Sequence, residues 1–160
     1  MSATKINESN QRHAPLLSAG APVPCPEAQV VTVLLVDDDC AASYSLWALL
    51  NWQPGIRVCA TAESAVEAIG LVRRLRPDVC LVSAALEGGE GVRLAHRITE
   101  LPEPSRVIIY TEHAGQDLAA MGAIAGAADA VWRYGDADQL ARTIKATAAR
   151  GLAAGVIALP

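Results

Sequence analysis

Five short apolar runs alternate with five segments of helical pattern, and this alternation constrains the fold more than any other feature of the chain. Three of the runs, residues 30–36, 79–82 and 107–110, are continuous and rich in β-branched residues and leucine. Continuous runs of this length are typical of parallel strands buried on both faces, because strands with one solvated face alternate apolar and polar residues. Residues 56–60 and 130–132 supply two shorter candidate strands.

Helical patterns fill the segments between the runs. We expect helices at residues 41–51, 64–75, 92–101, 116–125 and 137–149. Pro54-Gly55 and Pro77 lie where helices should end, Gly126 is placed for a left-handed helix cap, and polar residues 87–91 are typical of a loop. Regular alternation of strand and helix predicts a doubly wound α/β fold with a parallel sheet.

Composition sets the limits of this domain and excludes several classes of protein. We expect a disordered extension at residues 1–29, one domain at 30–150 and a linker or exit segment at 151–160. Apolar stretches fall short of the ~20 residues that a membrane-spanning helix needs. The net charge is −4 with scattered basic residues, which argues against direct nucleic-acid binding. The four cysteines form no C-x-x-C motif and indicate reduced thiols in a cytoplasmic protein.

Polar residues follow the predicted strands at the edge where ligands gather in open parallel sheets. Asp37-Asp38-Asp39 follow the first strand, and Ser83, Thr111 and Arg133 end the third, fourth and fifth. Adjacent carboxylates attract a hard cation or a base, so Asp37 and Asp38 predict an acidic pocket. Asp39 is placed to cap the next helix. The Thr111 hydroxyl suits either the pocket or a hydrogen bond to the backbone.

These segments resemble the response-regulator receiver domain of bacterial two-component signalling over about residues 31–150. The resemblance rests on V-L-L-V-D-D-D, R-P-D-V-C-L-V-S, G-G-E-G, V-I-I-Y-T and V-W-R. It implies a flavodoxin-like five-stranded sheet of order 2-1-3-4-5 with five surrounding helices. It also implies an acidic pair that helps to hold Mg²⁺, an aspartate ending the third strand that accepts a phosphoryl group, a hydroxyl ending the fourth and a lysine ending the fifth.

Three positions carry the family's usual residues and three do not. Asp37 and Asp38 match the acidic pair and Thr111 the hydroxyl, whereas Ser83 replaces the phosphoacceptor and Arg133 the lysine. Ala130 also stands where the family commonly has an aromatic residue.

The replacements change the expected chemistry. A serine hydroxyl needs a general base before it can attack a phosphoryl donor, and none is evident. With one anionic ligand missing, Asp37 and Asp38 should hold Mg²⁺ weakly at most. Arg133 could pair with these carboxylates and close the pocket. Glu112, next to Thr111, either adds charge near the pocket or is merely solvated.

A candidate partner surface lies on the first predicted helix. Leu46, Leu49 and Leu50 form its inward stripe, which places Tyr44, Trp47 and Asn51 on another face. Exposed aromatic residues often mark contacts, so we expect a homodimer or a domain contact through the first and last helices. Alternatively, Trp47 folds over its own helix or meets the last one.

The primary hypothesis is therefore an atypical receiver domain that is not an enzyme. It would signal without aspartyl phosphorylation, through dimerisation or contact with an output domain or regulatory protein. In the alternative, modification of Ser83 or a small ligand in the pocket is the trigger. A small flavodoxin-like enzyme is disfavoured, because D-D-D stands where a glycine-rich phosphate loop would. Many relatives continue into a helix-turn-helix DNA-binding domain, and residues 156–160 resemble the start of the linker to it.

Overall fold

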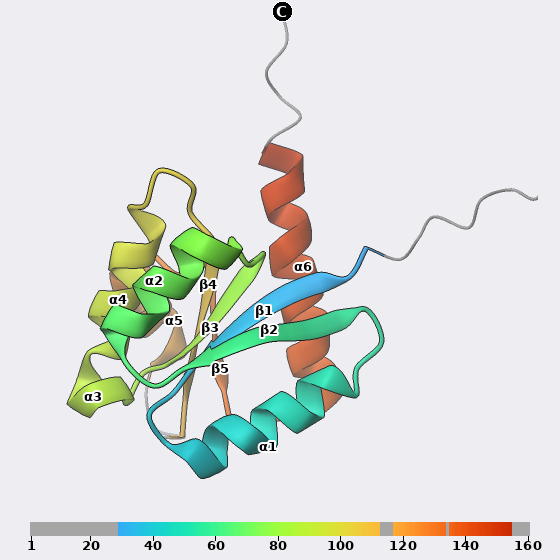
Figure 1. The fold of residues 1–160 in the computed structure, drawn as a ribbon, viewed down its shortest axis with the longest axis horizontal. Coiled ribbons are helices and arrows are strands. Elements are labelled where there is room, and N and C mark those ends of the chain that lie inside the picture. Colours follow the sequence, from blue (N-terminus) through green and yellow to red (C-terminus); the bar gives the residue numbers. More distant parts are fainter. Residues whose placement is uncertain (1–28, 113–116, 134, 155–160) are drawn as a thin grey trace, which may run out of the picture.

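The computed structural model of the chain describes residues 29–112, 117–133 and 135–154. Its strands form one parallel sheet (Figure 1). They are β1 (Val31–Val36), β2 (Ile56–Ala62), β3 (Val79–Ser83), β4 (Arg106–Thr111) and β5 (Asp129–Trp132). Hydrogen bonds join them in the order β2-β1-β3-β4-β5, with every neighbouring pair parallel. The predicted doubly wound sheet of order 2-1-3-4-5 is confirmed.

Helices cover both faces of the sheet (Figure 1). They are α1 (Cys40–Asn51), α2 (Ala65–Leu75), α3 (Leu86–Gly89), α4 (Gly91–Thr99), α5 (Leu118–Ala125) and α6 (Ala137–Ala154). In Figure 1, α1 and α6 lie on one face, and α2, α4 and α5 on the other. The strands therefore contribute to two separate cores.

Each core takes alternate side chains of the strands, as the pleat of a strand requires. On the side of α1 and α6, Val33 and Leu35 pack in one cluster with Leu50 and Ile144. On the other side, the intervening residues of β1, such as Leu34, pack with side chains of α2, α4 and α5. All five side chains of β3 are buried. Because these strands are buried on both faces, their sequences form continuous apolar runs.

Local capping signals act where they were expected. The Asp39 side chain caps α1 by accepting hydrogen bonds from the amides of Ala41 and Ala42. Gly126 follows α5 in a left-handed conformation with φ 62°. Both predictions are confirmed.

Several boundaries differ from the prediction. Residues 87–91 were expected to form a loop, but Leu86–Gly89 form the short helical turn α3 and α4 begins at Gly91. The turn is irregular, because Glu87 is left-handed with φ 46°. Helix α6 extends to Ala154, past the predicted helix end at Ala149, in keeping with the high helix propensity of alanine. The start predicted for the fourth helix, the extension before residue 29 and the segment 155–160 lie outside the described residues.

Candidate functional site

The structure places the polar strand-end residues at one edge of the sheet. Ser83 is the last residue of β3 and Thr111 the last of β4, whereas Asp37 directly follows β1 and Arg133 directly follows β5. Asp37, Ser83 and Thr111 are buried. Burial of so many polar groups at one edge requires that they satisfy one another or the backbone.

Tyr110 lies at the centre of this edge. Its side chain is buried, and its hydroxyl donates a hydrogen bond to Oδ2 of Asp37. Burial is the main cause of a raised pKa for Tyr110, followed by the hydrogen bond with Asp37 and the negative charge of that residue. The positive charge of Arg133 and a hydrogen bond with Ser83 act in the opposite direction on this pKa. The phenol therefore stays protonated, and it links Asp37 with Ser83.

The sequence pattern gave Tyr110 no role in the site, because the residue ends an apolar run and was counted as part of a strand. Two signals could have identified it. A buried tyrosine hydroxyl usually has a hydrogen-bond partner. In addition, Tyr110 precedes Thr111 and pairs with Ser83 across β3 and β4, so it lies at the same edge of the sheet.

Asp37 and Asp38 have different surroundings. Oδ1 of Asp37 accepts a hydrogen bond from the amide of Asp39 at 3.1 Å, so both oxygens of this buried carboxylate have donors. Asp38 is exposed, and its Oδ2 accepts the amide of Glu87 at 3.0 Å. The Glu87 side chain in turn accepts the amide of Ala65 at 2.9 Å. Asp38 thus connects the end of β1 to α3, and the Glu87 side chain connects α3 to the start of α2.

Arg133 forms an ion pair with Glu112, and the arginine is the more buried partner. The backbone amide of Arg133 also donates to the carbonyl of Thr111 at 2.9 Å. Of the two alternatives for Glu112, the structure favours an added charge over a merely solvated side chain, because its carboxylate pairs with a largely buried arginine. The predicted pairing of Arg133 with the acidic pair remains a prediction.

The residues at this edge fit a receiver magnesium site poorly. Both oxygens of Asp37 and one oxygen of Asp38 already accept hydrogen bonds from the protein. Ser83 contributes a neutral oxygen at the position where the sequence resemblance implies a carboxylate. Within the part of the chain that the structure describes, no group of three or more His, Cys, Asp or Glu side chains is placed to hold a metal ion. Mg²⁺ prefers a near-ideal octahedron of oxygens that usually includes carboxylates.

The aromatic residues of α1 form a surface of their own. Tyr44 and Trp47 are 70% and 42% exposed, and their rings stack with centroids 6.0 Å apart. They line a hollow of about 310 Å³ together with Cys40, Ser43, Thr61 and Glu63. Asn51 has another role, because its Oδ1 accepts the amide of Val58 at 3.0 Å and so ties α1 to β2. We therefore define the aromatic pair as Tyr44 and Trp47 alone.

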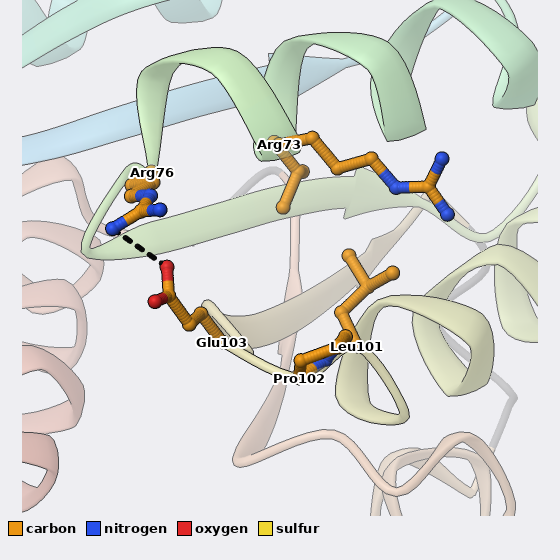
Figure 2. Close-up of a pocket in the computed structure, with 6 residues that line it drawn as sticks. Arg73, Arg76, Leu101, Pro102 and Glu103 are labelled. Atoms are coloured by element: carbon orange, nitrogen blue, oxygen red, sulfur yellow. Dashed lines mark ion pairs between the residues drawn. The ribbon is translucent and has the colours of Figure 1, made fainter.

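A separate hollow of about 500 Å³ lies where α2 ends, at the edge of the sheet opposite to Asp37. Figure 2 shows Arg73, Leu101 and Pro102 around it, and an ion pair of 2.7 Å between Arg76 and Glu103. Both partners of this pair are largely exposed to solvent. The hollow is a feature of the surface and takes no part in the acidic edge.

Residues 33–145 match the family model described as the response regulator receiver domain. The chain belongs to the response regulator receiver family. Among curated receiver proteins, it is 31% identical over 118 residues to the transcriptional regulatory protein LiaR of Bacillus subtilis, covering 73% of this chain and 56% of LiaR. It is 30% identical over 116 residues to the DNA-binding transcriptional activator DevR/DosR of Mycobacterium tuberculosis, covering 72% of this chain and 54% of that protein. This receiver thus spans about half the length of these relatives.

Solved receiver structures agree with the fold. A two-component response regulator of the LuxR family from Aurantimonas sp. SI85-9A1 superposes with a TM-score of 0.70 at 30% identity, covering 76% of this chain and 87% of that one. The response regulator domain of Thermotoga maritima CheB superposes with a TM-score of 0.67 at 23% identity, covering 76% of this chain and 98% of that one. None of the receiver's described helices has the length and apolar character to cross a membrane.

Proposed function

We propose that this protein is an atypical receiver domain that signals without aspartyl phosphorylation, as an interaction module and not as an enzyme. The observation that carries the proposal is Ser83 at the end of β3, where the family has its phosphoacceptor aspartate. A carboxylate can attack a phosphoryl donor directly, whereas a serine hydroxyl needs a base to take its proton. The Ser83 side chain interacts with Tyr110, a protonated phenol that is itself a donor to Asp37.

Burial of Ser83 also argues against the alternative trigger, a kinase that modifies this serine. The residue is 5% exposed, and its side chain interacts with Tyr110 inside the protein. A kinase must take the hydroxyl into its own active site, so β3 would have to be pulled from the sheet. Binding of a small ligand meets a similar obstacle, because protein donors already occupy the Asp37 oxygens.

The partner of this receiver would be an output domain, a regulatory protein or a second copy of the chain in the bacterial cytoplasm. LiaR and DevR/DosR are named as transcriptional regulators, and each is about twice as long as the matched segment. We propose the same setting here, with DNA contacted by an output domain such as a helix-turn-helix and not by the receiver. The exposed aromatic pair Tyr44 and Trp47 is the proposed contact surface.

The test is incubation with a small phosphodonor and Mg²⁺, followed by intact-mass analysis. We expect no phosphoryl adduct on the wild-type chain. A stable adduct that maps to the acidic edge would overturn the proposal. Ser83→Ala is the matched control, because an adduct that disappears in this variant lies on Ser83, whereas one that persists lies on another residue.

A further inference from the structure

We infer that the hydroxyl of Tyr110 takes the place of a divalent cation as the partner of Asp37, so that the acidic edge is closed to metal from within the protein. The inference deepens the proposed function, on which it rests for the view that this edge has lost its phosphoryl chemistry. It assigns part of the poor fit of this edge to Mg²⁺ to a single side chain.

The position of Tyr110 is fixed by the fold. The residue lies on β4 directly opposite Ser83 of β3, and its ring belongs to the core between the sheet and helices α1 and α6. Packed core side chains rest in single rotamers with few voids around them. The packing of the ring therefore holds the Tyr110 hydroxyl against Asp37. The hydrogen bond forms without the need to order a mobile side chain.

Hydrogen-bond donors of the protein engage both oxygens of Asp37, which would otherwise attract a cation. Oδ2 of Asp37 accepts the Tyr110 hydroxyl, and Oδ1 accepts the amide of Asp39 at 3.1 Å. A cation would have to displace the tyrosine and would leave its buried hydroxyl without an acceptor, which is unfavourable. It would also lose tightly held water and gain only two carboxylates and a neutral serine oxygen in return.

Whether the Tyr110 hydroxyl takes the place of a cation can be tested by removing only this hydroxyl. Tyr110→Phe leaves Asp37 with one unsatisfied oxygen, so we expect a lower melting temperature in metal-free buffer. Millimolar Mg²⁺ should then raise the melting temperature of Tyr110→Phe by several degrees and leave the wild type unchanged, because a ligand stabilises the folded state that binds it. Tyr44→Phe is the matched control, since it removes a solvent-exposed hydroxyl and should give no response to Mg²⁺.

A second pair of variants separates the tyrosine from the missing carboxylate. Ser83→Asp restores a third anionic side chain, yet with Tyr110 in place we expect Mg²⁺ affinity by calorimetry to stay close to that of the wild type. Adding Tyr110→Phe to Ser83→Asp should raise this affinity at least about tenfold, the effect of one hydrogen bond to a charged group. The measurement on Ser83→Asp alone tests the inference even where Tyr110→Phe does not fold.

Strong Mg²⁺ binding by wild-type protein or by Ser83→Asp would overturn the inference, as would equal affinity with and without the Tyr110 hydroxyl. These results would leave the proposed function standing, because that proposal is decided by the phosphodonor experiment on wild-type protein. The two can therefore fail separately.

Discussion

The backbone amide of Glu87 donates a hydrogen bond of 3.0 Å to Oδ2 of Asp38, across 49 positions of sequence. This bond holds the left-handed residue of α3 against the end of β1. The second member of the acidic pair, which the sequence presents as a metal ligand, therefore has a structural role in this protein.

Removing that carboxylate should destabilise the fold. We expect Asp38→Ala to lower the free energy of unfolding by about 1 kcal/mol, because the Glu87 amide loses a charged acceptor at a solvent-accessible site. Asp38→Asn keeps an acceptor oxygen and should lose less. Urea denaturation of the three proteins measures the difference, and equal stability of Asp38→Ala and wild type would contradict the structural role.

Gly91 should tolerate no side chain. A Cβ atom at this position would lie 1.9 Å from the carbonyl oxygen of Ser83, a backbone atom of β3 that has no freedom to move aside. We expect Gly91→Ala to lower the free energy of unfolding by about 3 kcal/mol, the upper range for overpacking. Gly70→Ala is the control, because its Cβ would meet nothing within 4 Å in α2. Gly70→Ala should stabilise the protein by roughly 0.5–1 kcal/mol, and a similar loss in both variants would contradict the prediction.

Stability should fall in alkaline solution because of a buried thiol. Burial raises the pKa of Cys80 from 9.0 to about 12. Between these values the unfolded chain loses this proton and the folded chain keeps it, so the free energy of unfolding decreases as the pH rises. The effect of one such group is up to about 4 kcal/mol. The raised pKa of Tyr110 acts in the same direction.

Urea denaturation at a series of pH values from 8 upward measures this decline. Cys80→Ala should start from a lower stability at pH 8 because it leaves a small cavity, but it should decline less steeply as the pH rises. Parallel curves for Cys80→Ala and wild type would show that another group causes the alkaline loss.

Self-association should depend on the aromatic pair. We expect Trp47→Ala to raise the dissociation constant of the proposed homodimer at least about tenfold, because exposed tryptophans at interfaces are frequent hot spots. Trp52→Ala is the control, since Trp52 is 89% exposed at the end of α1 and lies outside the pair. Sedimentation equilibrium gives both constants. Equal weakening by the two variants, or a monomer at every concentration, would contradict this surface.

The fold could be predicted from the sequence because its signals are local and agree with one another. Apolar runs such as residues 79–82 have the length and continuity of strands buried on both faces, and all of β3 is indeed buried. Asp39 and Gly126 mark helix ends through hydrogen bonds and dihedral angles within a few residues. The turn α3 was missed because it depends on a distant carboxylate, that of Asp38, and not on its own sequence.

The sequence by itself determined the parallel sheet, its strand order through the family resemblance, and the set of polar residues at the strand ends. Only the tertiary structure decided how these residues pair: Tyr110 with Asp37, Asp38 with Glu87, and Arg133 with Glu112. The physical reason is the distance along the sequence between the residues that interact. Strand and helix patterns arise from neighbours along the chain, whereas each partner of a buried polar group is chosen by which strands lie side by side and which way their side chains face.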